Sequence, residues 1–158
     1  MKKNTFIRFL PLFILFFSTT IGFSQIVQPS DTSQGGSLCI SAGCTANSIE
    51  IIGAYIGQSD GTAITNCAQA GPYYIFVDVH RNGVKHDLLV QFNLSVNGGA
   101  STLYTIKYYG EVLSELYKTI AVPNWVCGDQ RVLKDIWVAW DTTSDNTANC
   151  PPDANYSQ

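Results

Sequence analysis

Histidines and carboxylates in the middle of the chain are the first candidates for chemistry. His80 and His86 flank an Asn-Gly turn, and Glu111 and Glu115 lie four residues apart. The register expected around the turn points the two imidazole rings to opposite faces, which disfavours a shared metal ion. The two glutamates could act as the carboxylate pair of a glycoside hydrolase, but a solvated charged edge is the simpler interpretation.

Oxygen-bearing side chains near the end of the chain raise the question of a calcium site. Asp141, Asp145 and Asn146 carry suitable ligand atoms, but an EF-hand loop needs a denser spacing of ligands and a distal glutamate. The sequence also lacks the His-Glu-x-x-His and Gly-x-Ser-x-Gly motifs and a phosphate-binding glycine loop. It therefore predicts no catalytic, cofactor-binding or metal-binding residue, and it indicates that the protein is not an enzyme.

Tyrosine and tryptophan side chains are the candidates for a ligand-binding surface. Their rings suit the apolar faces of sugars, and their hydroxyl and indole groups can form hydrogen bonds. We expect Tyr108, Tyr109 and Trp125 to form this surface. The competing interpretation is ordinary packing in the protein core.

Five cysteines indicate disulfide bonds in an exported chain, and they lack the Cys-x-x-Cys pairs of zinc sites. Cys39, Cys44, Cys67 and Cys127 lie close to predicted strands and are the disulfide candidates. Because an odd number of cysteines cannot all pair within one chain, one thiol must be free or bonded elsewhere. Cys150 lies in a polar tail, and we expect it to be the unpaired cysteine.

The first 24 residues have the features of a secretory signal peptide. Three basic residues precede a short apolar run at 9–17, and Gly22 and Ser24 follow at the spacing of a signal peptidase site. A membrane anchor would need about 20 apolar residues. Cleavage after Ser24 would remove three basic residues and no acidic one, which changes the formal charge from −3 to −6. We expect a secreted or cell-surface protein whose mature chain begins at Gln25 and is not inserted in a membrane.

Composition is typical of one globular domain. Hydrophobic residues make up 46% of the chain and charged residues 13%, which is too apolar for disorder. The absence of a basic excess argues against a nucleic-acid partner. We expect an extended leader at 25–43, a folded domain at 44–141 and a polar tail at 142–158.

The strongest local signal is the Asn-Gly pair at 82–83, which lies between alternating apolar segments at 73–80 and 86–96. A two-residue turn there would place Val77 opposite Leu88 and bring the apolar side chains of both segments onto one face. The sequence therefore predicts a β-hairpin at this position.

The same register has one unfavourable consequence. It would place Asp78 opposite Asp87, and like charges on paired residues destabilise a sheet. A solvated edge is the simpler interpretation of this pair, and a cation site is the alternative.

A second hairpin is predicted around residues 97–99, Asn-Gly-Gly. The apolar pattern selects a three-residue loop with a glycine in the left-handed conformation, which pairs Phe92 with Tyr104. Together with the first hairpin, this makes a three-stranded meander that ends with the segment at 102–109.

Other short segments complete the expected architecture. Residues 48–56 and 132–140 are typical of strands, whereas 111–119 fits either a helix or a strand. A single sheet would leave one apolar face open to water. The sequence therefore predicts an all-β, antiparallel, disulfide-stabilised β-sandwich of the immunoglobulin or jelly-roll kind.

Two blocks of sequence carry a resemblance to a known class of protein. The first begins with Cys44-Thr45-Ala46-Asn47 and continues through 54–57 to Cys67, and the second covers 124–129 and 133–141. Together they resemble the N-terminal module of large secreted surface adhesins of gliding bacteria, across most of residues 44–141. The second block, Asn-Trp-Val-Cys-Gly-Asp followed by Leu-Lys-Asp-Ile-Trp-Val-Ala-Trp-Asp, is the more specific.

The resemblance implies export by a type IX-like route and a role in adhesion or surface interaction, within an adhesin that has further domains. We expect a non-enzymatic module that binds a glycan or a protein surface. The alternative is a carbohydrate-binding module or a small secreted enzyme that acts on polysaccharides.

Overall fold

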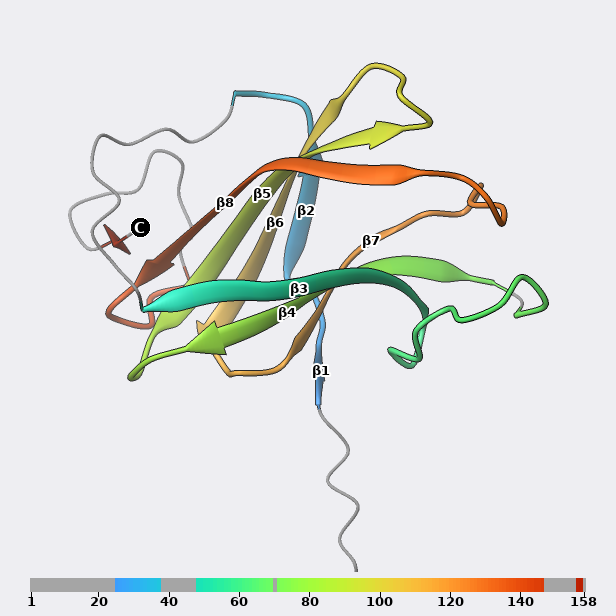
Figure 1. Ribbon diagram of the computed structural model, residues 1–158. Coiled ribbons are helices and arrows are strands. Elements are labelled where there is room, and N and C mark those ends of the chain that lie inside the picture. Colours follow the sequence, from blue (N-terminus) through green and yellow to red (C-terminus); the bar gives the residue numbers. More distant parts are fainter. Residues whose placement is uncertain (1–24, 38–47, 70, 147–155, 158) are drawn as a thin grey trace, which may run out of the picture.

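The computed structural model describes residues 25–37, 48–69, 71–146 and 156–157 of the 158-residue chain (Figure 1). Within these ranges the secondary structure consists of strands, which form two sheets packed face to face. The predicted all-β sandwich is confirmed. Among the described residues there is no helix with the length and apolarity needed to cross a membrane.

The two sheets contain four and five strands. The smaller sheet has the order β1-β7-β4-β3, formed by β1 (Ile26–Val27), β7 (Leu116–Ala121), β4 (Tyr73–Arg81) and β3 (Ile49–Gln58). The larger sheet has the order β2-β6-β5-β8-β9, formed by β2 (Asp31–Gln34), β6 (Thr102–Glu111), β5 (His86–Val96), β8 (Arg131–Asp141) and β9 (Tyr156–Ser157). Neighbouring strands are antiparallel except β1 and β7, which are parallel.

The segment expected to be an extended leader contributes one strand to each sheet. β1 pairs with β7, and β2 pairs with β6 from Asp31 opposite Lys107 to Gln34 opposite Tyr104. The sequence did not indicate this strand, because the four side chains of β2 are polar and exposed and give no alternation of apolar and polar residues. The predicted signal peptide, which ends at residue 24, lies outside the described residues.

The second predicted hairpin is confirmed. β5 and β6 pair with Phe92 opposite Tyr104, and their ring centroids lie 5.9 Å apart. The turn has Asn97 and Gly98 both in the left-handed region, with φ of 49° and 73°. The Gly99 amide closes it with a 2.8 Å hydrogen bond to the Val96 carbonyl. The Asn-Gly pair thus supplies the backbone conformation that matches the twist of the strands.

The first predicted hairpin is wrong, and the three-stranded meander with it. β4 belongs to the smaller sheet and β5 to the larger, so Val77 and Leu88 are not neighbours on paired strands. Both residues are fully buried in the core between the sheets. The apolar alternation therefore identified which side chains face the core, but not which strands are paired.

The connection between β4 and β5 turns a corner between the sheets. The Asn82 amide donates to the Ser48 carbonyl at 2.7 Å, and the Lys85 carbonyl accepts from the Val112 amide at 2.8 Å. Gly83 has a φ of 77°, whereas Asn82 is not among the described residues with positive φ. A hairpin turn of the expected type needs both residues in that region.

Residues 111–119, which fitted either a helix or a strand, end in the strand β7. Its buried Tyr117 packs edge-on against Tyr108 of β6, with ring centroids 4.8 Å apart. The Tyr108 hydroxyl donates to the Lys118 carbonyl at 2.8 Å. Burial in this core, and then the proximity of Tyr117, raise the pKa of Tyr108 well above its ordinary value.

Candidate binding site

The three aromatic residues predicted to form a ligand surface do not share one surface. Alternation along β6 sends Tyr108 into the core, where it is 3% exposed, and leaves Tyr109 39% exposed on the opposite face. Trp125 is partly buried in the loop between β7 and β8. The expected surface is therefore not formed, and for Tyr108 the competing interpretation, core packing, is correct.

The two histidines lie on strands of different sheets, His80 on β4 and His86 on β5, and two of the carboxylates take part in the fold. Glu111 forms an ion pair with Arg81 at 2.7 Å. Asp141 is buried, and its Oδ1 accepts from the Thr143 amide at 3.0 Å. Within the described part of the chain there is no group of three or more histidine, cysteine or acidic side chains that could hold a metal ion.

Asp87, considered from the sequence only as the expected partner of Asp78, holds the segment that follows β8. Asp87 has a φ of 49° at a bulge in β5. Its Oδ1 accepts from the Gly110 amide at 2.6 Å, and its Oδ2 accepts from the Asp145 and Asn146 amides, each at 3.0 Å. Two of the three residues considered for calcium, Asp145 and Asn146, thus use their backbone amides to bind this carboxylate.

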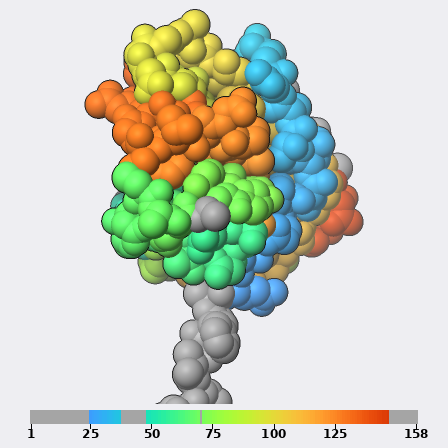
Figure 2. Space-filling model, turned by 90° about the vertical axis from the view of Figure 1, so that its right-hand side faces the viewer, coloured from blue at the N-terminus to red at the C-terminus, as the bar shows by residue number. Residues whose placement is uncertain are grey.

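Two of the disulfide candidates form a bond. Cys67, in the loop after β3, is linked to Cys127, in the loop after β7, across a sequence separation of 60 residues. In the space-filling view the segment that carries Cys127 (orange) lies directly against the segment that carries Cys67 (green) (Figure 2). Cys39, Cys44 and Cys150 lie outside the described residues, so the expectation of a free Cys150 stays a prediction.

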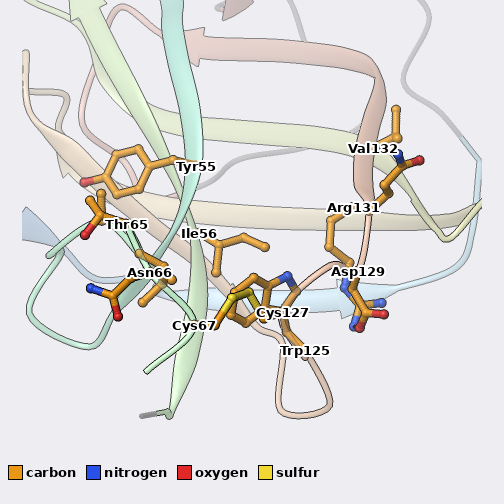
Figure 3. A pocket seen from close by; sticks show the side chains of 13 residues that line it. Tyr55, Ile56, Thr65, Asn66, Cys67, Trp125, Cys127, Asp129, Arg131 and Val132 are labelled. Carbon is orange, nitrogen blue, oxygen red and sulfur yellow. A yellow bond between two sulfur atoms is a disulfide. The ribbon is translucent and has the colours of Figure 1, made fainter. Parts of the chain in front are cut away.

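A groove of about 740 Å³ lies beside this disulfide, between β3 and the beginning of β8. Tyr55 and Thr65 lie at one end, and Trp125, Asp129 and Arg131 lie at the other (Figure 3). The wall between them is mainly apolar. It includes Ile56, Ile64 and the disulfide itself, and Val132 extends the apolar lining beyond Arg131 (Figure 3).

The β3 side of the groove is shaped by a loop that folds back on the strand. The Ile64 amide donates to the Ile56 carbonyl at 3.1 Å, and the Gln58 amide donates to the Thr62 carbonyl at 2.8 Å. These bonds need Gly57, because a Cβ there would lie 2.9 Å from the Thr62 carbonyl oxygen and 3.0 Å from the Phe76 ring. The loop therefore covers the free edge of β3 where it borders the groove.

The opposite side is held by Asp129. Its Oδ1 accepts from Asn97 Nδ2 at 2.8 Å, and its Oδ2 accepts from the Val126 amide at 3.1 Å and lies 3.3 Å from Arg131 Nη2. The bond from Asn97, then that from Val126, and finally the charge of Arg131 lower the pKa of Asp129. The carboxylate fixes the loop against β5 and β8.

Two nitrogen atoms on this side have no hydrogen-bond partner. Less than 1 Å² is exposed of Trp125 Nε1 and of Arg131 Nε, and neither donates to any acceptor among the described residues. The Trp125 ring packs edge-on against Tyr73, with centroids 4.9 Å apart. An unsatisfied buried donor costs free energy unless an acceptor reaches it, so a ligand oxygen could fill this role.

Sequence reasoning found Cys67, Cys127 and Trp125 as separate candidates, but it did not find the groove. Arg131 and Ile56 were missed because nothing in their local sequence distinguishes them from ordinary strand residues. The available signal was the spacing of Trp125, Cys127 and Asp129 within one short loop. No family model, curated protein or solved structure matched the chain.

Proposed function

We propose that the protein is a secreted, non-enzymatic β-sandwich module of a bacterial surface adhesin, and that it contacts surfaces through the groove between β3 and β8. The single observation that carries this proposal is a groove of about 740 Å³ with two unpartnered donors, Trp125 Nε1 and Arg131 Nε. This volume is within the range of small-ligand sites.

The scaffold suits a binding role. The groove is formed largely by two loops, which the Cys67–Cys127 bond joins and the packed sheets support. Loops on a rigid scaffold commonly carry recognition residues. Because the covalent link limits their relative motion, less conformational entropy would be lost on binding.

The chemistry of the groove also favours binding over catalysis. Asp129 is the carboxylate that lines it, and three donors already surround its two oxygen atoms. These contacts lower the pKa of Asp129, which makes the carboxylate a weaker base and disfavours a general-base role. A carbohydrate-binding module is the second candidate, favoured by the Trp125 indole group beside an apolar wall.

The experiment measures the attachment of beads coated with the exported protein to surfaces bearing polysaccharides or proteins. Thr65 lines the groove and is exposed, so Thr65→Trp would obstruct it. Thr142→Trp places the same side chain at an exposed position after the far end of β8 and serves as the control.

We expect Thr65→Trp to reduce attachment at least about tenfold, because a blocked groove loses its contacts together, and Thr142→Trp to have little effect. Circular dichroism would establish that both variants fold. Failure of the wild-type beads to attach to any surface, or equal attachment by Thr65→Trp, would overturn the proposed function.

A further inference from the structure

Two hydrogen-bond donors at the Trp125 end of the groove have no partner. An indole N–H and a guanidinium N–H can only donate. Trp125 Nε1 and Arg131 Nε both lack an acceptor, whereas each oxygen of Asp129 already accepts at least one hydrogen bond. A ligand carboxylate, which has only acceptors, would satisfy both donors without bringing a proton of its own.

Arg131 strengthens the preference for an anionic group. Its side chain is 9% exposed, and its planar guanidinium suits a carboxylate better than a point charge would. The contact with Asp129 uses Nη2 and leaves Nε unpartnered. Shielding from bulk water also makes a charge-assisted hydrogen bond stronger than at an open surface.

The rest of the groove favours a sugar over an extended peptide. A peptide that added to β3 as a strand would need free backbone groups on that edge. Beside the groove the Ile56 carbonyl and the Gln58 amide are bonded to the loop at Ile64 and Thr62. The apolar wall suits the C–H face of a sugar ring, and the exposed side chains of Thr65 and Asn66 can meet ring hydroxyls.

We propose that the groove binds a carboxylate-bearing sugar of an acidic polysaccharide, with the carboxylate at Arg131 and Trp125. This proposal rests on the proposed function, in which the groove is the binding site. Less than 1 Å² of each nitrogen atom is exposed, so the carboxylate reaches them only when the side chains that cover them move, as side chains at binding sites commonly do.

The experiment titrates the exported protein with three acidic probes: oligogalacturonate, oligomannuronate and sialyllactose. The neutral counterparts are the methyl esters of the same three probes, which keep the sugar and remove the charge. We expect at least one acidic probe to bind at least about tenfold more tightly than its neutral counterpart, since charge-assisted hydrogen bonds are about twice as strong as neutral ones.

Two variants separate the contributions of the donors. Trp125→Phe removes the indole N–H and keeps a ring against Tyr73, and we expect a loss of affinity of about threefold to tenfold. Arg131→Met removes the guanidinium and keeps an apolar stem, and we expect a loss of at least about tenfold. Lys134→Met removes one positive charge from an exposed position of β8 outside the groove lining and should change affinity less than about twofold.

Thermal unfolding establishes that each variant folds, and Trp125→Phe still tests the proposal if Arg131→Met is too unstable. Binding of no acidic probe, or equal binding of acidic and neutral counterparts, would overturn the acidic-sugar proposal. So would selective binding of poly-glutamate, which carries carboxylates on a polypeptide. None of these three results changes the outcome of the bead-attachment experiment. A failure of the acidic-sugar proposal can therefore be distinguished from a failure of the groove as a binding site.

Discussion

The hydroxyl of Tyr108 in β6 donates a 2.8 Å hydrogen bond to the carbonyl of Lys118 in β7, and so joins the two sheets through the core. Burial raises the pKa of Tyr108 and also that of its neighbour Tyr117. Both groups ionise near pH 10 when the chain is unfolded. Below that pH their stabilisation is fully present, and it is lost as the pH rises further.

We therefore expect the free energy of unfolding to fall as the pH rises above about 10, because ionisation then favours the unfolded chain. Tyrosinate absorbance during an alkaline titration measures this directly. Tyr108 and Tyr117 should ionise only as the protein unfolds, and Tyr108→Phe should reduce by one the number of tyrosines that ionise in that step. Complete ionisation of all eight tyrosines before unfolding would contradict the buried placement.

Removal of the Cys67–Cys127 bond should destabilise the sandwich. The bond closes a loop of about 60 residues, which in the chain-entropy model lowers the entropy of the unfolded state by the equivalent of about 4 kcal/mol. We expect the double variant Cys67→Ser, Cys127→Ser to lose about 3–4 kcal/mol in urea unfolding. A loss below about 1 kcal/mol would show that the link contributes little.

Asp87→Ala should be costly because it leaves three backbone amides without their acceptor. We expect a loss of about 2–4 kcal/mol in the free energy of unfolding, and a smaller loss for Asp87→Asn, which keeps one carbonyl acceptor and tolerates positive φ. The control is Asp31→Ala on an exposed position of β2. Similar losses for Asp87→Ala and Asp31→Ala would disprove the bracing role of Asp87.

Two glycines of β3 offer a matched pair of substitutions. Gly57→Ala would bring a methyl group to 2.9 Å from the Thr62 carbonyl oxygen, whereas at Gly53 the nearest atom, Asp78 Cβ, is 3.9 Å away. We expect Gly57→Ala to cost about 1–3 kcal/mol by overpacking and Gly53→Ala to be tolerated. Equal unfolding midpoints for the two variants would be inconsistent with the close approach of the loop to β3.

The sequence predicts a strand pairing correctly where the residues that determine the pairing are close together along the chain. The turn at Asn97 and Gly98 fixes the pairing of β5 with β6, because turn chemistry and side-chain alternation act together within one hairpin. At Asn82 the same dipeptide occurs in a corner, and the deciding contacts come from Ser48 and Val112, which are distant in sequence. Reasoning from a short stretch of sequence cannot identify hydrogen-bond partners that are distant along the chain.

The sequence nevertheless contained one observation against the first predicted hairpin. The hairpin would have placed Asp78 opposite Asp87, and the structure separates them: Asp78 pairs with Gly53 on β3, and Asp87 lies buried at a bulge in β5. The unfavourable pairing of like charges was therefore a sign of a wrong register rather than of a solvated edge or a cation site.

The groove itself could not be derived from the sequence. Its walls come from β3, β8 and two loops, and it depends on how the two sheets are stacked. The sequence could supply the parts, such as Cys127 and Trp125, because their types are informative alone. It could not place Arg131 beside Trp125, since that depends on the Asp129 contacts and on the course of β8.

The most direct test of the central claim is a map of the binding surface by NMR. The backbone amide and indole N–H resonances of the ¹⁵N-labelled protein would be followed during titration with the tightest-binding acidic oligosaccharide, with oligogalacturonate as the default probe. The account predicts shifts at Ile56, Thr65, Trp125 and Arg131, with the Trp125 indole resonance moving and those of Trp137 and Trp140 unchanged. Shifts concentrated instead around exposed Tyr109, or an unperturbed Trp125 indole resonance at saturation, would contradict it.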